Sequence, residues 1–366
     1  MRALAFAQAL WQSARGGVPR PGYCTYLVTY RCNARCRMCD SWRLKPGEEL
    51  SPDQAEAIFA DIGRLDVVRL TGGEPFLRTD FAELARRVQA ASRPRVLHVT
   101  TNGSFPDRVA AFALGFPHPR RLSFMVSLDG VGPRHDDNRG ADVSYDTALE
   151  TVERLVALRP RLGLSVSVNH TVISPASLAD SAALKARLRP LGVDVQSVLA
   201  YADSAMYSIR LRGRRADHLV AGHGYPLHPD LAGADVVEFV EEELRQSAAL
   251  RSPALRLGKR YYLRGLLARL RGDPDPQPHP ACVALRSHLR LLPDGRVPVC
   301  QFNTEVVGDL REASLDSVWR GEVAAAARAW VDACSGCWAE CEVIPSAIYT
   351  GDLIGLPRLL KRRLRA

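Results

Sequence analysis

Six short segments rich in β-branched and aromatic residues alternate with segments that carry helix signals between residues 24 and 199. Capping residues mark helix starts, as at Ser51 before Pro52 and at Ser144. Repeated strand–helix units place parallel strands in one sheet that helices cover. Six units are fewer than the eight of a closed barrel, so the sequence predicts an α/β fold, a partial (β/α)6 TIM-like barrel. The expected strands are residues 24–30, 67–71, 95–101, 121–128, 162–171 and 193–199, and the helices are expected to start near residues 51, 79, 106, 144 and 177.

Chemically distinctive residues follow five of these expected strands. The first strand runs into a loop with three cysteines, and the second ends in Thr71-Gly72-Gly73-Glu74-Pro75. The carboxyl ends of parallel strands meet at one face of such a sheet, so we expect these residues to line one mouth. The next three strands end in Asn102-Gly103, Ser127-Leu128-Asp129-Gly130 and Asn169-His170-Thr171.

The three cysteines of the first loop are Cys32, Cys36 and Cys39, in the pattern C-x3-C-x2-C. Structural zinc normally takes four ligands, and no fourth ligand stands close by in the sequence. Iron–sulfur clusters are usually held by four thiolates, so three thiolates on a four-iron cluster would leave one iron open to a substrate. Neighbouring arginines are expected to stabilise the thiolates: Arg31, Arg35 and Arg37.

A second group of five cysteines lies near the C-terminus: Cys282, Cys300, Cys334, Cys337 and Cys341. The turn at residues 293–295 predicts a hairpin between Cys282 and Cys300, with the later three cysteines folding back onto it. Five thiolates can hold one four-iron cluster with one left over, and the later triplet leaves the identity of the spare open. A zinc ribbon is the chemical alternative. An odd total of nine cysteines in a chain of 366 residues argues against a disulfide framework and for a reducing compartment.

The positive charge is concentrated at the two ends of the chain. The net charge is +9, yet residues 1–39 hold six arginines without an acid, and residues 346–366 hold five basic residues against one acid. The main body is therefore close to neutral, which disfavours a broad nucleic-acid groove. The last residues, 356–366, can form a short basic amphipathic helix, which either packs on the body or makes weak contact with a membrane surface.

Together these residues resemble the radical SAM superfamily. The resemblance covers about residues 23–202 and rests on C-x3-C-x2-C, the GGEP of residues 72–75, and the TNG and SLDG that end successive strands. It implies a [4Fe–4S] cluster held by Cys32, Cys36 and Cys39, whose open iron binds S-adenosylmethionine. In this family the reduced cluster passes an electron to the sulfonium, which releases methionine and a 5′-deoxyadenosyl radical that abstracts hydrogen from substrate.

The resemblance also implies a cofactor-binding set around that cluster. Glycines at a strand end allow close approach of the backbone, and Glu74 can pair with the amino group of S-adenosylmethionine. Arg139 either holds the carboxylate of that cofactor or orders its loop. His98, His170 and Cys24 are interpreted as core residues without a chemical role. The full expected set is Gly72, Gly73, Glu74, Pro75, Asn102, Ser127, Asp129, Arg139 and Asn169.

The C-terminal cysteines resemble the auxiliary-cluster domains called SPASM and, in shorter form, Twitch. A full SPASM pattern has further cysteines, so the resemblance implies one auxiliary [4Fe–4S] cluster, held by Cys282, Cys300 and two of the later three. The implied organisation is an N-terminal basic and apolar segment at 1–22, a radical SAM core at 23–202, a helical connector with a Pro-rich linker at 203–280, a small auxiliary-cluster domain at 281–345 and a basic tail at 346–366.

The implied function is that of a cytoplasmic radical SAM oxidoreductase acting on a small biosynthetic metabolite, such as a sugar or aminocyclitol. The auxiliary cluster would assist electron transfer, and reduced flavodoxin or ferredoxin would be the electron donor. Peptide maturation and the modification of a lipid precursor by a protein peripheral to the membrane are the substrate alternatives. A non-catalytic iron–sulfur carrier or redox sensor is the alternative of another class, which has no need of a Gly-rich site facing an open iron.

Overall fold

The computed structural model of the protein describes residues 17–45, 47–140, 142–208, 225–233 and 235–355. The terminal residues proposed for membrane-surface contact, 1–16 and 356–366, lie outside these ranges. Within the ranges, every helix is too short or too polar to span a lipid bilayer.

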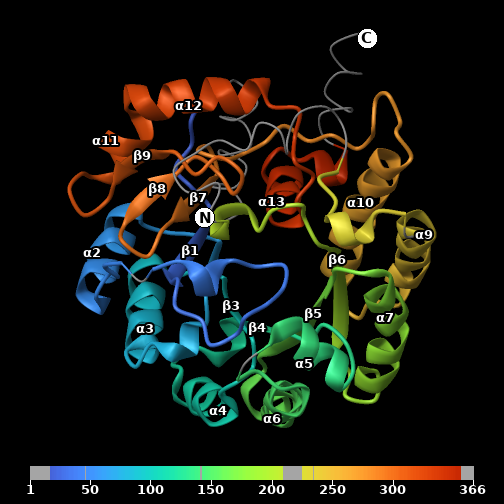
Figure 1. The fold of residues 1–366 in the computed structure, drawn as a ribbon. Helices are drawn as coiled ribbons and strands as arrows, with labels where there is room; N and C mark the ends of the chain where they lie inside the picture. Colours follow the sequence, from blue (N-terminus) through green and yellow to red (C-terminus); the bar gives the residue numbers. More distant parts are fainter. Residues whose placement is uncertain (1–16, 46, 141, 209–224, 234, 356–366) are drawn as a thin grey trace.

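Seven parallel strands form one curved sheet with its helices on the outside (Figure 1). The strand order is β6-β5-β4-β3-β2-β1-β7, so neighbours in the sequence are neighbours in the sheet until the last strand. All six predicted strands are present, and the partial barrel is confirmed. The strands are β1 (Tyr23–Thr29), β2 (Val67–Gly72), β3 (Val96–Thr101), β4 (Leu122–Ser127), β5 (Ser165–Val172), β6 (Asp194–Leu199) and β7 (His288–Leu291).

The helices that follow the strands begin at the predicted signals. Ser51 accepts from the backbone N–H of Gln54, whose side chain accepts from Ser51 in return, a complete capping box. The last helix differs from the prediction, because Ser174 is its cap and Ser177 lies inside the first turn. The helices are α2 (Pro52–Ile62), α3 (Phe81–Ser92), α4 (Pro106–Gly115), α5 (Pro133–Arg139), α6 (Tyr145–Leu162) and α7 (Pro175–Leu188).

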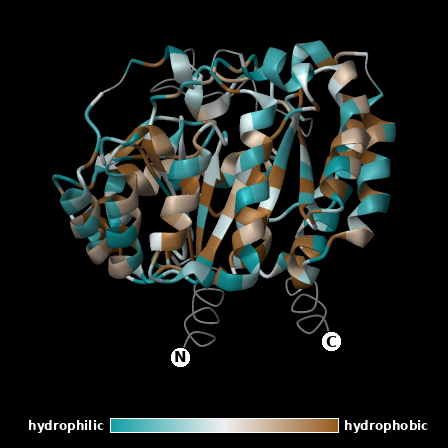
Figure 2. Cartoon of the chain, turned by 90° about the horizontal axis from the view of Figure 1, so that it is seen from below, coloured by the Kyte–Doolittle hydropathy of each residue, from teal (hydrophilic) through white to brown (hydrophobic). Residues whose placement is uncertain are grey.

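Side chains alternate between the two faces of each strand. On β5, Val168 and Val172 are fully buried on the outer face, whereas Ser167 and Asn169 line the inside of the barrel. The outward residues join the main hydrophobic core beneath the helices. Figure 2 shows the resulting pattern, with hydrophobic residues along the strands and hydrophilic residues on the outer helix surfaces. The inner face of β5 therefore presents polar side chains to the inside of the barrel.

The predicted C-terminal hairpin is wrong in its pairing. A turn does form, since the N–H of Gly295 donates to the carbonyl of Leu292. The arm before the turn, β7, pairs in parallel with β1 at the edge of the large sheet. The arm after it, β8 (Arg296–Pro298), pairs antiparallel with β9 (Val306–Asp309) instead. The sequence predicted the turn correctly, but the strands on either side of it pair with different strands, β7 with β1 and β8 with β9.

The remaining helices pack on the open side of the sheet. They are α9 (Val236–Gln246), α10 (Pro253–Leu270), α11 (Leu315–Arg320), α12 (Glu322–Ala333) and α13 (Glu340–Tyr349). A second core forms there around Tyr262 and Trp338, with Leu199 at the end of β6. The connector predicted at 203–280 thus contributes two packed helices, of which only α9 was expected.

Candidate functional site

The three cysteines after β1 lie in a loop that is fastened to α5. Backbone N–H groups of Arg35 and Arg37 donate to the carbonyls of Arg139 and Asn138, at 2.7 and 3.0 Å. Around this loop a small apolar cluster forms from Ala34, Val143 and the three cysteines with Met38. Two segments about 100 residues apart therefore fix the positions of the thiols.

Burial raises the pKa of Cys32 and of Cys39 to about 12, and it also raises the pKa of Cys36. The Arg139 guanidinium opposes that rise at Cys36, because its Nη1 lies 3.7 Å from the Cys36 Sγ. Such thiols are protonated until iron replaces the proton. Arg139 is the cation placed to stabilise the thiolates.

The arginines expected to surround the thiols have other partners. Arg31 pairs with Glu49 at 2.9 Å, and Arg37 pairs with Asp230 at 3.0 Å. The Arg35 guanidinium lies 6.0 Å from the centre of the Trp42 ring. Sequence neighbours of the cysteines point away from them, and the cation that approaches comes from the distant α5.

Arg139 is itself held by Asp129 at the end of β4. Its Nε donates to the Asp129 carboxylate at 2.6 Å, and that carboxylate also accepts from Asn138 and from the N–H of Thr171. Burial acts to raise the pKa of Asp129, but Arg139 outweighs it and the pKa is lowered. Asp129 is 1% exposed and does not line the cavity described below. It positions Arg139 and ties β4 to β5.

The two glycines after β2 are required by the backbone of the cysteine loop. A Cβ on Gly73 would lie 2.1 Å from the carbonyl oxygen of Arg31, and one on Gly72 would lie 2.2 Å from that of Thr29. Gly72 also has a φ of +139°, which other residues rarely adopt. The glycines therefore bring the ends of β1 and β2 together, rather than only making room for a ligand.

Glu74 is fully buried, and protein donors surround it. The N–H of Phe76, the hydroxyl of Thr101 and the N–H of Asn102 donate to its carboxylate, at 3.0, 2.9 and 2.7 Å. Burial raises the pKa of Glu74 to about 7, against those hydrogen bonds. Pro75 is buried beside it. Glu74 and Pro75 lie behind the cavity wall, where Glu74 sets the position of Asn102.

A cavity of about 290 Å³ opens over the cysteine loop. Asn102, Ser127 and Asn169 line it from the ends of β3, β4 and β5, and Arg139 lines it from α5, together with Gly72 and Gly73 after β2. The amide nitrogen of Asn102 lies 4.0 Å from the Cys32 Sγ. The structure thus brings the predicted strand-end residues and all three thiols to one mouth, with Glu74, Pro75 and Asp129 one layer behind.

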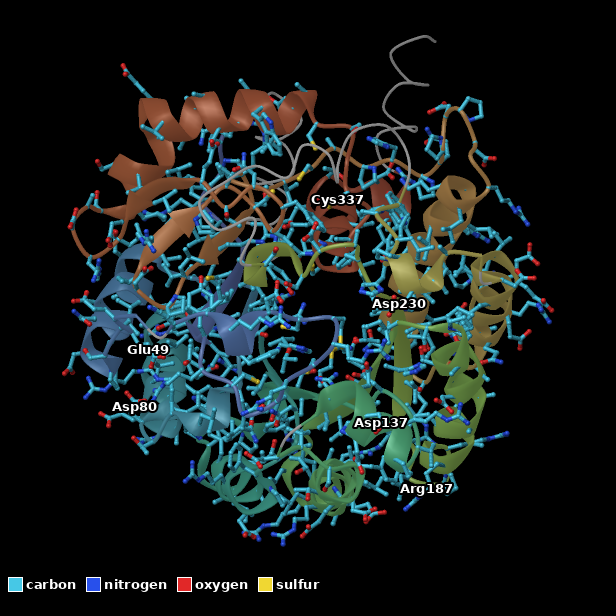
Figure 3. All side chains as sticks on the ribbon, in the orientation of Figure 1. Glu49, Asp80, Asp137, Arg187, Asp230 and Cys337 are labelled. Atoms are coloured by element: carbon cyan, nitrogen blue, oxygen red, sulfur yellow. The ribbon has the colours of Figure 1, made fainter. Side chains whose placement is uncertain are left out.

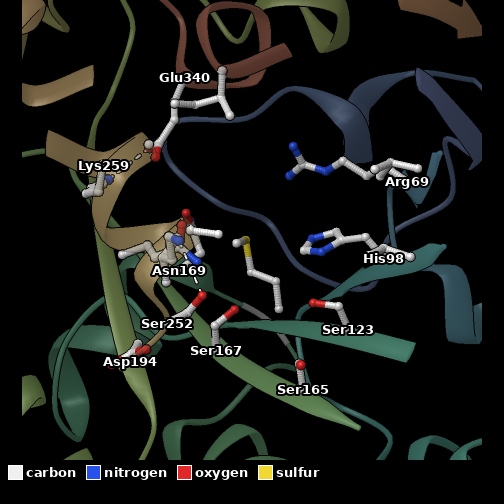
Figure 4. Close-up of a pocket in the computed structure, with 18 of the residues that line it drawn as sticks. Arg69, His98, Ser123, Ser165, Ser167, Asn169, Asp194, Ser252, Lys259 and Glu340 are labelled. Atoms are coloured by element: carbon white, nitrogen blue, oxygen red, sulfur yellow. Dashed lines mark hydrogen bonds and ion pairs between the residues drawn. The ribbon is translucent and has the colours of Figure 1, made fainter. Parts of the chain in front are cut away.

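A second cavity, of about 620 Å³, fills the inside of the barrel (Figure 4). It shares Arg69, Asn169, Val198 and Tyr201 with the cavity above it, so the two are continuous. His98 points into this cavity, while His170 is buried on the outer side of β5. Burial lowers the pKa of His98 to about 3 and lowers that of His170. His98 was expected in the core, and it lines the cavity instead as a neutral imidazole.

Two lining residues were missed by sequence reasoning. Arg69 is a charged residue in the middle of a short strand, and that position alone was a usable sign of an inward-facing function. Lys259, 3% exposed by side chain, pairs with Glu340 at 2.9 Å and comes from the unpredicted helix α10. Only the tertiary fold places it against β6.

The five C-terminal thiols gather beside α13, and Figure 3 places Cys337 there. Cys300, Cys334, Cys337 and Cys341 pack around Phe302, as the prediction of a triplet folding back requires. All nine cysteines are free of disulfides. Among the residues that the structure describes, no three His, Cys, Asp or Glu side chains are arranged to hold a single metal ion.

Burial raises the pKa of Cys282, Cys300, Cys337 and Cys341, and the Glu342 carboxylate adds to the rise at each of them. Smaller contributions come from other cysteines of the group, which raise the pKa of Cys282, Cys300 and Cys337 further. At Cys341 the main neighbours are Arg290, Glu342 and Arg69. The Cys341 thiol donates to Gln301 at 2.6 Å and lines the inner cavity. Cys341 therefore also faces the barrel, while it packs with Cys300, Cys334 and Cys337 around Phe302.

Two family models match the chain. Residues 26–184 match that of the radical SAM superfamily, and residues 282–338 match that of an iron–sulfur cluster-binding domain, SPASM. Both matches fall on the segments that carry the two cysteine groups.

Curated relatives match over less than half of the chain. Pre-heme d1 synthase of Dinoroseobacter shibae is 36% identical over 43% of this chain and 37% of its own length. GTP 3′,8-cyclase of Aquifex aeolicus is 32% identical over 40% of this chain and 46% of its own. Mycofactocin maturase MftC of Mycobacterium tuberculosis is 32% identical over 47% and 43%. The chain thus spans less than half the length of these relatives.

Solved structures share the fold over most of the chain. Streptococcus suis SuiB bound to S-adenosylmethionine has a TM-score of 0.59 at 13% identity, over 85% of this chain and 68% of that one. The structure of anSMEcpe with bound AdoMet has a TM-score of 0.53 at 15% identity, over 83% and 78%. At these identities the likeness shows the fold alone.

Proposed function

We propose that the chain is a radical SAM enzyme with a C-terminal SPASM iron–sulfur domain, and that it abstracts hydrogen from a small metabolite by means of a 5′-deoxyadenosyl radical. A radical SAM domain implies a [4Fe–4S] cluster and S-adenosylmethionine, and a SPASM domain implies auxiliary iron–sulfur clusters. One observation carries the proposal: the three thiols of one loop line a cavity that residues at the ends of the parallel strands also line.

Cys32, Cys36 and Cys39 would hold the first cluster. The chemistry of this donor set fits, because the three thiols share one loop and Nη1 of Arg139 faces the Cys36 sulfur. When bound, the cluster supplies the electron that breaks the S–C5′ bond of S-adenosylmethionine. The protein's own part is to hold three thiolates and to offset their charge.

The residues that face the cavity would bind the organic part of the cofactor. Asn102, Ser127 and Asn169 present hydrogen-bonding groups there, and Arg139 presents a cation that suits a carboxylate. Gly72, Gly73 and Pro75 shape the wall between them. Glu74 and Asp129 would act as positioning residues, since each is buried and holds one of the facing side chains.

Cys282, Cys300, Cys334 and Cys337 would hold one auxiliary [4Fe–4S] cluster, with Cys341 as the spare thiol. This assignment is supported by the contacts of the Cys341 thiol, which donates to Gln301 and lies 3.8 Å from Arg290 Nη2. Four protein thiolates complete the ligation of such a cluster. Its role would then be electron transfer and not substrate binding.

A small metabolite suits the space inside the barrel. A cavity of about 620 Å³ lies in the range of small-molecule sites. The names of the relatives, a GTP cyclase, a pre-heme d1 synthase and a mycofactocin maturase, indicate different substrates, so the substrate must be argued from this chain's own cavity. Peptide and lipid-precursor substrates remain the alternatives. We propose a cytoplasmic protein served by reduced flavodoxin or ferredoxin, because nine free thiols suit a reducing compartment.

Formation of 5′-deoxyadenosine tests the proposed chemistry. The protein is reconstituted with iron and sulfide without oxygen, then given dithionite and S-adenosylmethionine, and product is measured by chromatography. We expect product from the wild type, none from Cys36→Ala, and wild-type amounts from Cys24→Ala, because Cys24 is fully buried inside β1. Equal product from Cys36→Ala and the wild type would refute the assignment.

Iron content tests the auxiliary assignment separately. Cys300→Ala should lose about four iron atoms per chain, whereas Cys341→Ala should keep the wild-type content. A loss of iron in Cys341→Ala that equals the loss in Cys300→Ala would show that Cys341 is a ligand.

A further inference from the structure

Arg69 occupies the point where the two cavities join. It lies on β2 between Thr25 of β1 and His98 of β3 in the register of the sheet, and it lines both spaces. Figure 4 shows its guanidinium reaching into the inner cavity beside the His98 ring. Asn169, Val198 and Tyr201 also line both spaces, so a molecule in the inner cavity that extends toward the cysteine loop lies beside these side chains and Arg69.

The guanidinium has no acidic partner among the described residues. Its Nη2 makes a long hydrogen bond to the Thr100 hydroxyl, at 3.4 Å, and its Nε is buried without a partner. Other arginines of the barrel are held by carboxylates, as Arg139 is by Asp129 and Arg78 by Asp80. Arg69 as a whole is only partly buried, but its Nε is shielded from water without a partner, so an anion bound beside it would supply the missing hydrogen bond and counter-charge.

The groups near Arg69 do not supply that anion. His98 is neutral, since burial and Arg69 together lower its pKa to about 3. The acids that line the inner cavity are Glu340, which Lys259 neutralises, and Asp194. Arg159 and Arg251 line the same space, so its cations outnumber its acids. The cavity as a whole therefore favours a negatively charged occupant.

We propose that Arg69 anchors an anionic group of the substrate, a carboxylate or a phosphate ester, inside the barrel. A guanidinium suits both groups, because its fork donates two parallel hydrogen bonds to a pair of anionic oxygens. The hydroxyls of Ser123, Ser165 and Ser167 line the same cavity, on β4 and β5, and suit a polar substrate body. An anchored substrate then lies next to the cavity over the cysteine loop, where the proposed radical would form.

This inference deepens the proposed function. It rests on that function only in one respect, the statement that the molecule carrying the anionic group is the substrate. Anion binding is measured without turnover, so the two claims fail separately. A protein that binds an anion through Arg69 but makes no 5′-deoxyadenosine would contradict the function and leave the anion site in place. A protein that makes 5′-deoxyadenosine but binds no anion would support the function and contradict the anion site.

The test titrates inorganic phosphate, and in a second series acetate, into the cluster-loaded protein by calorimetry. Chloride keeps the ionic strength constant, and saturating S-adenosylmethionine is present so that its own carboxylate is accounted for. We expect saturable binding of one anion in the wild type, weakened at least ten-fold in Arg69→Gln and less in Arg69→Lys. Arg64→Gln is the matched control, because it removes the same charge from an exposed position and should bind like the wild type.

The outcomes distinguish the two kinds of anionic group, and some of them would overturn the proposal. Preference for phosphate indicates a phosphate ester, and preference for acetate indicates a carboxylate. Arg69→Met, which keeps the bulk of the side chain, replaces Arg69→Gln if the latter fails to fold. The proposal is overturned if neither anion saturates the wild type, if removal of the Arg69 charge leaves the affinity unchanged, or if S-adenosylmethionine abolishes anion binding.

Discussion

His135 is held neutral by a single backbone contact next to Asp129. The N–H of Asp129 donates to the His135 Nδ1 at 3.1 Å, so that nitrogen must stay unprotonated, and the ring is fully buried. Burial, and then the charge of Arg139, lowers the pKa of His135 to about 4. Protonation of this imidazole at low pH would therefore break its hydrogen bond to the loop that carries Asp129.

The pH dependence of stability follows from that pKa. Because the unfolded chain binds a proton near pH 6.5 and the folded chain only near pH 4, the contribution is fully present above pH 6.5 and is lost as pH falls toward 4. At pH 5.5 the loss is about 1.4 kcal/mol, or ~2 °C in unfolding temperature for a chain of this size. We expect His135→Gln, whose amide oxygen can accept the same hydrogen bond, to lose less stability than the wild type between pH 7.5 and 5.5.

Thermal unfolding at the two pH values measures this difference. The exposed His118→Gln is the control and should follow the wild type. Parallel curves for the wild type and His135→Gln would contradict a neutral His135. Buried His98, His170 and His288 also have lowered pKa values, so the wild type itself should weaken on acidification.

Helix α13 is joined to the edge strand β7 by one buried carboxylate. Glu342 is 4% exposed and accepts from Arg290 Nε at 2.9 Å and from the N–H of Gln301 at 3.3 Å, with His288 Nδ1 at 3.1 Å. Burial acts to raise the pKa of Glu342, but Arg290 and His288 outweigh it and lower the pKa to about 2. The element that begins at Glu340 and carries Cys341 is thereby fixed against the barrel.

Removing that carboxylate should destabilise the joint. Glu342→Ala leaves the Arg290 cation buried without its partner, which typically costs about 3–5 kcal/mol. We expect an unfolding temperature ~5 °C lower at pH 7.5, with partial recovery in Glu342→Gln, which keeps an acceptor. The exposed Glu312→Ala is the matched control. A Glu342→Ala protein as stable as Glu312→Ala would show that the joint does not depend on this pair.

The C-terminal part completes the sheet of the N-terminal part. Strand β7 pairs with β1 from Tyr23 opposite His288 to Tyr26 opposite Leu291, and the main core contains side chains from both parts. Without β7, strand β1 would present a row of unpaired backbone groups at the edge of the sheet. The segment that carries the auxiliary thiols is thus also a structural part of the barrel.

A chain that ends at residue 280 should therefore aggregate. The uncovered edge of β1 and the exposed core face would associate with other copies, and size-exclusion chromatography would find the protein in the void volume. Co-expression of residues 281–366 as a second polypeptide should recover a soluble complex. A soluble, monomeric 1–280 chain that forms 5′-deoxyadenosine would show that the edge needs no cover.

The sequence by itself determined the six strand–helix units, the two cysteine groups and the residues at the strand ends. These features are local: strand length, capping residues such as Ser51, and the spacing of Cys32, Cys36 and Cys39 can be read within a few residues. Topology then brings Asn102, Ser127 and Asn169 to one mouth, because parallel strands share their carboxyl ends.

Only the tertiary structure decided which charges meet. The cation beside Cys36 is Arg139 from α5 and not its sequence neighbours, the Cys341 thiol meets Gln301 and Arg290, and Arg69 pairs with no carboxylate among the described residues. The arm after Cys282 joins β1 instead of closing a hairpin. Each of these contacts joins segments that lie far apart in the chain. Local sequence patterns do not show which distant side chain or strand will lie beside a given residue in the folded protein.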